Sequence, residues 1–119
     1  MLSRGITIAI RYSLVRRQFR DPDSRSTGDD ERAVLSYPSL NRKLIPMLAQ
    51  SYAYILAGRR MQVLYDELSE QLDSGNTALL ADTHVASSSL KAYCTDRSLE
   101  GIEECRKALG GHGFSVYSG

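Results

Sequence analysis

Apolar residues recur every three or four positions along most of this chain, which is the period of an α-helix with one buried face. The first such segment spans residues 3–19. Its apolar stripe consists of Ile6, Ile10, Leu14 and Val15. The β-branched residues also permit a strand, but we favour a helix because it keeps Arg11, Arg16 and Arg17 off the stripe.

Two longer periodic segments follow, at residues 36–72 and 77–109. The first keeps helical spacing through Leu40, Leu44, Leu48, Ser51, Ile55, then Gln62 or Val63, and finally Leu68 and Leu72. The second does so through Ala86, Leu90, Cys94, Ser98, Ile102, Cys105 and Leu109. The small residues of this second stripe favour close helix packing. Gly101 costs about 1 kcal/mol of helix propensity relative to alanine, so a packing or ligand reason is expected for it.

The links between these segments are short or polar. An exposed loop is expected over residues 20–34, because residues 20–32 contain Pro22 and Gly28 and no apolar side chain. A glycine turn at residues 110–113 ends the last helix. The sequence therefore predicts one all-α, partial helical domain over residues 1–119. Its three long antiparallel helices form an incomplete four-helix bundle, since three such helices leave an apolar side uncovered.

Composition narrows the function classes. A net charge of +1 gives no overall field that would favour nucleic acid, so no nucleic-acid partner is expected. No apolar run reaches the roughly 18 residues that a membrane span needs. Cys94 and Cys105 are about 16 Å apart along one helix, too far to form a disulfide, so both are expected to be reduced.

Two places carry candidate chemistry. Arg16, Arg17 and Gln18 precede Phe19 at the end of the first helix, and guanidinium groups there suit a phosphate or diphosphate. Taken alone, these residues favour a solvated helix end, which the helix dipole stabilises. Gly110 and Gly111 let the backbone approach a partner closely, although a plain helix cap followed by a polar tail has the same pattern.

Other reactive side chains do not form a site in the sequence. His84 and His112 have no second ligand at metal-binding spacing, so no metal is expected. Ser87, Ser88 and Ser89 have no base at a defined offset, so a hydrolase triad is not supported.

Three blocks of the chain resemble the peroxisomal acyl-CoA oxidases, which are relatives of the acyl-CoA dehydrogenases. Residues 7–19 read TIAIRYSLVRRQF. Residues 43–54 read KLIPMLAQSYAY, and SSSLKAYCT follows at 87–95. The last block, residues 102–119, reads IEECRKALGGHGFSVYSG, and its CR and GGHG are typical of oxidases rather than most dehydrogenases.

The resemblance implies the helical bundle that follows the middle β-domain, with the fold of the acyl-CoA dehydrogenase C-terminal domain. These enzymes are FAD-dependent homodimers that desaturate acyl-CoA to trans-2-enoyl-CoA in fatty acid β-oxidation, with O₂ reduced to H₂O₂. The helical domain of one subunit reaches the FAD of the other. On this basis Arg16 meets the FAD diphosphate with Gln18 and Phe19 alongside, while Gly110 and Gly111 approach the adenosine.

The chain departs from the family pattern in places. Asn41 and Arg42 replace the usual glutamines, and Lys107 stands where dehydrogenases have a glutamine. The catalytic glutamate of the family belongs to a FEGEN-like stretch expected beyond Gly119, so no catalytic residue is assigned here. The isolated 119 residues are therefore expected to be inactive, and the peroxisome is the location that the resemblance implies. The alternatives are a non-catalytic helical interaction module and a fragment of an acyl-CoA dehydrogenase.

Overall fold

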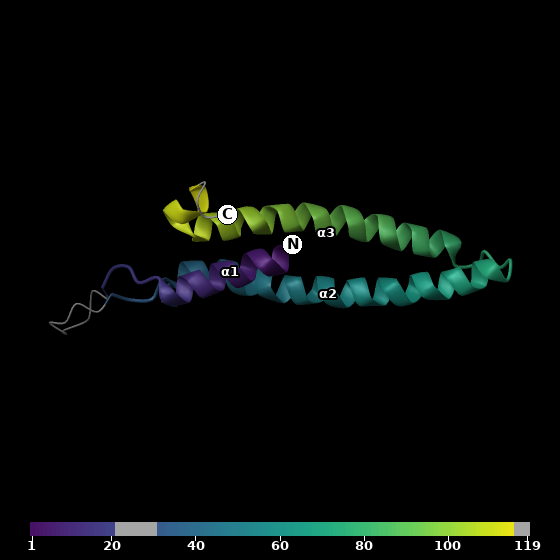
Figure 1. Ribbon diagram of the computed structural model, residues 1–119, viewed down its shortest axis with the longest axis horizontal. Coiled ribbons are helices and arrows are strands. Elements are labelled where there is room, and N and C mark those ends of the chain that lie inside the picture. Colours follow the sequence, from purple (N-terminus) through teal and green to yellow (C-terminus); the bar gives the residue numbers. More distant parts are fainter. Residues whose placement is uncertain (21–30, 116–119) are drawn as a thin grey trace.

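The computed structural model describes residues 1–20 and 31–115. Within those ranges the regular elements are all helical, as expected from the periodicity (Figure 1). In chain order they are α1 (Leu2–Val15), the short 3₁₀ helix η1 (Val34–Ser36), α2 (Pro38–Asp73), α3 (Leu80–Ala108) and the 3₁₀ helix η2 (Gly110–Phe114).

The two long helices form an antiparallel hairpin, and α1 lies along only one half of it (Figure 1). The molecule measures 76 × 30 × 16 Å, with a radius of gyration of 20.8 Å. A compact domain of this length would have a radius of gyration of about 13.5 Å. The predicted incomplete bundle is confirmed, because no helix of the described residues packs against the half of the hairpin that lies beyond α1.

The first helix is shorter than predicted. It ends at Val15, so the expectation that it continues to Phe19 was wrong. Residues 16–19 are instead held by backbone hydrogen bonds to residues 32–34, around an antiparallel bridge between Arg17 and Ala33. This pairing ends the helix because it uses the backbone groups that a further turn would need.

The two long helices also start later than predicted. Pro38 is the first residue of α2, and Tyr37 before it is extended (φ −74°, ψ 124°) because a residue preceding proline avoids the α region. The third helix begins at Leu80 rather than Thr77. The side chain of Asn76 accepts a hydrogen bond from the Ala78 amide (3.0 Å), which forms a turn ahead of the helix.

The polar link between α1 and α2 is only partly described. Residues 21–30 of the loop expected over 20–34 lie outside the described residues. Arg32, Ala33 and Val34 are half-buried rather than exposed, because this part of the link pairs with residues 16–19 and leads into η1.

The core lies where α1 meets the hairpin. Its centre consists of Ile6, Ala9, Leu44 and Cys105. The buried stripe of α1 is Leu2, Ile6, Ala9 and Ser13. Ile6 and Ile10 of the predicted stripe do pack in or against the core, but the prediction was wrong for Leu14 and Val15, which are exposed. The small residues Ala9 and Ser13 face the hairpin in their place.

Gly101 shows why that approach is close. It is buried in α3, and an added Cβ would lie 2.6 Å from Cδ1 of Leu2 on α1. The packing reason expected for this glycine is thus present, since any side chain at residue 101 would displace Leu2. The predicted stripe of α3 is half-buried or buried at every position.

The stripe of α2 is only partly covered. Leu44, Ser51 and Leu68 are buried, but Ile55, Gln62, Val63 and Leu72 are exposed. Other large apolar side chains on the two long helices are exposed as well, including Leu56, Tyr65, Val85 and Leu99. An uncovered apolar side is what a bundle lacking one helix presents.

Candidate functional site

Both sequence-predicted groups lie at one end of the molecule, where α1 ends, α2 begins and α3 ends (Figure 1). Tyr12, in the last turn of α1, contacts His112 of η2 edge to face, with ring centroids 5.6 Å apart at 67°. Arg16 follows Tyr12 by one helical turn, and Gly111 directly precedes His112. The contact therefore brings the arginine segment and the glycine turn to the same end of the bundle.

The backbone of residues 16–19 is fixed by the returning chain. The Val34 amide donates to the Arg16 carbonyl (2.8 Å), the Gln18 amide to the Arg32 carbonyl (2.9 Å), and the Arg32 amide to the Phe19 carbonyl (2.9 Å). These bonds hold an extended strip that projects past the helix end. The side chains of this strip are exposed.

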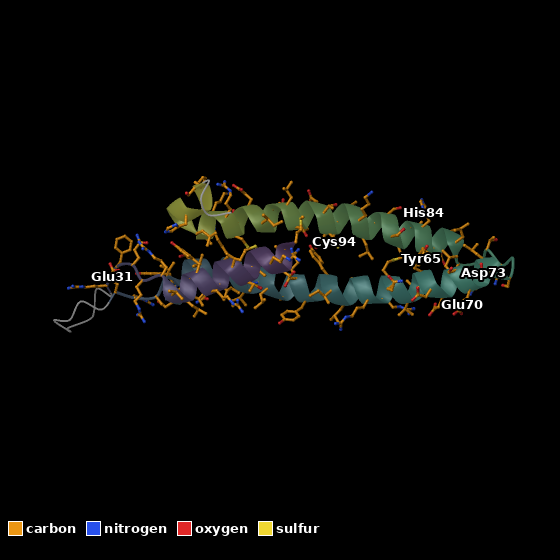
Figure 2. The ribbon with its side chains drawn as sticks, in the orientation of Figure 1. Glu31, Tyr65, Glu70, Asp73, His84 and Cys94 are labelled. Atoms are coloured by element: carbon orange, nitrogen blue, oxygen red, sulfur yellow. The ribbon has the colours of Figure 1, made fainter. Side chains whose placement is uncertain are left out.

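The two arginines of this strip differ in their partners. Nη1 of Arg17 donates to the carbonyl oxygen of Glu31 (3.1 Å), the residue labelled at that end in Figure 2. The guanidinium of Arg16 makes no hydrogen bond or ion pair with any residue in the described ranges. Of these two side chains, Arg16 has its donors available for an anion.

Phe19 and Gln18 are held in an unusual way. Phe19 has φ 61°, the left-handed region that an aromatic residue rarely adopts, and its ring is 68% exposed. The hydroxyl of Tyr37 donates to the Gln18 carbonyl (2.8 Å), and the Arg32 guanidinium lies 4.9 Å from the Tyr37 ring centroid. The turn at residues 18–19 thus has a strained backbone that neighbouring side chains hold in place, a combination that recurs at ligand sites.

The three glycines of the turn have different local requirements. Gly110 has φ 58°, which favours glycine over any other residue. An added Cβ on Gly113 would lie 2.0 Å from the carbonyl oxygen of Arg106. Gly111 has neither constraint, because nothing lies within 4 Å of its added Cβ. Its backbone is therefore open to a partner outside the described chain.

Sequence reasoning missed the part played by Arg106. Its guanidinium forms a bidentate pair with Glu103 (2.7 and 2.8 Å) and lies 4.0 Å from the ring centroid of Phe114. The hydrogen bond from Arg106 lowers the pKa of Glu103, and the same pair raises the pKa of Arg106. The i, i+3 spacing of Glu103 and Arg106 was visible, but the fold-back of Phe114 was not.

A second ion-pair group joins α2 to α3. Glu104 accepts from Lys43 of α2 (2.8 Å) and from Lys107 (3.0 Å). These hydrogen bonds lower the pKa of the Glu104 carboxyl, and the bond from Lys43 has the larger effect. Glu100 is paired with Arg97 (2.7 Å). Glu100, Glu103 and Glu104 are thus each paired with a cation.

An apolar groove of about 270 Å³ runs between α1 and α3 and is closed by η2. Cys105 lies at its base, where burial raises the pKa of the thiol.

His84 is exposed near the opposite end of the hairpin (Figure 2). Among residues 1–20 and 31–115 no group of histidine, cysteine or carboxylate side chains could hold a metal ion. Nor is any described helix long and apolar enough to cross a bilayer.

A family model described as "Acyl-CoA oxidase, C-alpha1 domain" matches residues 1–119. The chain belongs to the acyl-CoA oxidase family. Peroxisomal acyl-coenzyme A oxidase 1 of Dictyostelium discoideum is 40% identical over 119 residues, which are 99% of this chain and 17% of that protein. The Rattus norvegicus protein of the same name is 42% identical over 118 residues, again 99% and 17%. The family that the three sequence blocks indicated is confirmed.

Solved acyl-CoA oxidases have the same fold over these residues. Acyl-CoA oxidase-1 of Caenorhabditis elegans, complexed with FAD and ATP, superposes with a TM-score of 0.88 at 40% identity, covering 97% of this chain and 17% of that one. Acyl-CoA oxidase-2 of the same organism, bound with FAD, ascaroside-CoA and ATP, gives 0.88 at 42% identity with the same coverage. The chain thus spans about a sixth of the length of these relatives.

Proposed function

We propose that residues 1–119 form one helical domain of a peroxisomal, FAD-dependent acyl-CoA oxidase of fatty acid β-oxidation. Relatives that match along the chain are named peroxisomal acyl-coenzyme A oxidases. Two similar solved structures were obtained with FAD bound. The whole protein would convert acyl-CoA to trans-2-enoyl-CoA, with O₂ reduced to H₂O₂.

The observation that carries this proposal is the pairing of two ligand-ready features at one end of the bundle. The Arg16 guanidinium is exposed and makes no hydrogen bond with residues 1–20 or 31–115, and Gly111 has open space on its Cβ side. A cation that donates paired hydrogen bonds suits a diphosphate, and bare backbone suits a flat group approaching closely. An FAD molecule carries both parts, so the residues present fit it.

In this proposal Arg16 binds the diphosphate of FAD, Gln18 and Phe19 lie beside it, and Gly110 and Gly111 meet the adenosine. FAD, when bound, supplies the acceptor for the hydride taken from the acyl-CoA. The part of this chain is to bind and orient. Glu103 and Glu104 are occupied by cations and have lowered pKa values, which disfavours either as the catalytic base. We therefore propose that the catalytic base lies in a part of the whole protein other than residues 1–119.

The exposed apolar side of the hairpin supports a homodimer through the helical domain. Leu56, Val63 and Leu99 are among the large apolar side chains that water contacts there. A second copy would bury such side chains, and the nucleotide site of one subunit would then lie against the flavin of the other. This arrangement follows the resemblance stated above.

Replacement of Arg16 tests the proposal. The host is C. elegans acyl-CoA oxidase-1 with these 119 residues in place of its own matching segment. Arg16→Ala should raise the FAD dissociation constant about 10- to 100-fold, because it removes hydrogen bonds to a charged group. Fluorescence titration of the apoenzyme measures this constant.

Arg11→Ala is the matched control, since Arg11 is also an exposed α1 arginine but lies before the helix end. It should leave the FAD dissociation constant within about twofold of the parent, as expected for a surface substitution. Equal constants for the two variants would overturn the assignment of Arg16.

A further inference from the structure

The η2 turn is ordered without a hydrophobic core. None of its residues, Gly110–Phe114, is buried. Three of the five are glycines, which lose more backbone entropy on ordering than any other residue. Burial therefore cannot account for the fixed conformation of this turn, and polar or aromatic contacts must supply its stability.

Arg106 supplies such contacts from α3. The bidentate pair with Glu103 (2.7 and 2.8 Å) fixes the plane of its guanidinium. The ring of Phe114 then lies over this group, 4.0 Å from the guanidinium carbon to the ring centroid. That separation is well within the range of a cation–π interaction. The last residue of the turn is thus attached to the last full turn of the helix.

The backbone of Arg106 contacts the same turn. An added Cβ at Gly113 would lie 2.0 Å from the Arg106 carbonyl oxygen, so the two chain segments are in direct contact. Nη1 of Arg106 is also 3.5 Å from the Gly113 carbonyl oxygen. Phe114 and Gly113 therefore both rest on a single residue of α3.

A second contact comes from α1, where Tyr12 meets His112 edge to face (5.6 Å). With the ends of the turn fixed by α3 and its middle by α1, Gly110 and Gly111 are left exposed in one defined orientation. We propose that Arg106 is a positioning residue, which acts through Phe114 to hold the Gly110–Gly111 backbone where it meets the flavin nucleotide. We call the contact of Arg106 with Phe114 and Gly113 the clamp. Its effect on FAD binding rests on the proposed function, whereas the contact itself does not.

The first experiment measures the clamp on the 119-residue chain without FAD. Phe114 is 65% exposed, so replacing it uncovers no core. Phe114→Leu should speed backbone amide exchange at residues 110–115 by about two- to fivefold, the effect of losing one exposed cation–π contact. Phe114→Tyr keeps the ring and should exchange at the parent rate. Equal exchange in parent, Phe114→Leu and Phe114→Tyr would overturn the clamp.

The second experiment measures FAD binding in the C. elegans host described above. Arg106→Met and Phe114→Leu should each weaken FAD by a similar factor, and the double variant should be no weaker than the poorer single one. Phe114→Tyr keeps the ring and should bind FAD with the affinity of the parent. Additive effects of the two substitutions would show that Arg106 does not act through Phe114, and the inference would fall.

The two proposals fail in different ways. If Phe114→Leu speeds exchange but neither it, Gly111→Ala nor Arg16→Ala changes FAD affinity, the proposed FAD site at this end of the bundle is wrong, while the contact between Arg106 and Phe114 stands. If Gly111→Ala and Arg16→Ala weaken FAD while Phe114→Leu does not, the nucleotide site stands and the positioning role of Arg106 is wrong.

Discussion

Gly110, Gly111 and Gly113 lie within four positions, yet the structure gives each a different reason to be glycine. Gly110 needs a positive φ, and Gly113 needs the absence of a Cβ against Arg106. Gly111 meets no demand from the described chain. The sequence showed the glycine cluster but could not separate these reasons, because they depend on the local φ and on how η2 folds back against Arg106 of α3.

Alanine substitutions should separate these roles in the isolated chain. Gly113→Ala forces the turn away from the Arg106 carbonyl and should destabilise η2 by about 1–3 kcal/mol, as overpacking does. Gly111→Ala should leave the turn intact. Amide exchange at residues 110–115 is the measurement, and equal protection in the two variants would contradict the close approach at Gly113.

At the scale of elements, helical periodicity was enough to predict three helices and the incomplete bundle. It failed at the boundaries. The end of α1 is set by pairing with residues 32–34, and the start of α2 by Pro38, which acts on Tyr37. It also misplaced the buried stripe of α1, because Ala9 and Ser13 are buried by a close crossing that a hydrophobicity pattern does not contain.

Two helix glycines test that close crossing. Gly58 of α2 has open space around its added Cβ, so Gly58→Ala should stabilise the chain by about 0.5–1 kcal/mol through helix propensity. Gly101→Ala should show no such gain, because its Cβ would lie 2.6 Å from Leu2. Urea unfolding followed by circular dichroism measures both, and an equal gain at the two sites would argue against the α1–α3 contact.

The ion pair between Lys43 and Glu104, which joins α2 to α3, makes the stability depend on pH. Glu104 has a lowered pKa in the folded chain, chiefly through the hydrogen bond from Lys43. A lowered folded pKa means that its contribution is complete above the unfolded value of about 4.3 and is lost as pH falls through the folded value. The melting temperature should therefore fall with acidification in this range.

Glu104→Gln should flatten that fall, while Glu100→Gln serves as the control because Glu100 pairs with Arg97 inside α3 alone. Melting curves recorded across the acid range would give the comparison. An unchanged pH slope in Glu104→Gln would show that the α2–α3 ion pair does not contribute to stability.

At the scale of the whole molecule, the extended shape and the uncovered apolar side indicate a domain that works against other parts of a protein. The radius of gyration of 20.8 Å is far above that of a compact domain of this length, about 13.5 Å. The acyl-CoA oxidase family accounts for this shape, since the matching residues form only 17% of the solved C. elegans enzyme. The sequence could predict that part of the apolar surface of the three helices is left exposed, but not which part of a protein packs against it.

The 119 residues alone should not oxidise acyl-CoA. The carboxylates of Glu100, Glu103 and Glu104 are paired with cations, and no cluster among the described residues resembles an acid–base site. Incubation of the purified chain with FAD and palmitoyl-CoA should give no hydrogen peroxide above the protein-free background. Peroxide formation that depends on the chain would show that a catalytic base lies within these residues.

The central claim is that the bundle end carrying Arg16 and the glycine turn contacts FAD. The most direct measurement is a crystal structure, with FAD bound, of the C. elegans oxidase that carries these 119 residues. We expect the Arg16 guanidinium to lie within about 3 Å of a diphosphate oxygen, the distance of a charged hydrogen bond, and the Gly111 backbone to contact the adenosine. An FAD molecule whose diphosphate and adenosine both lie away from this end of the bundle would contradict the account.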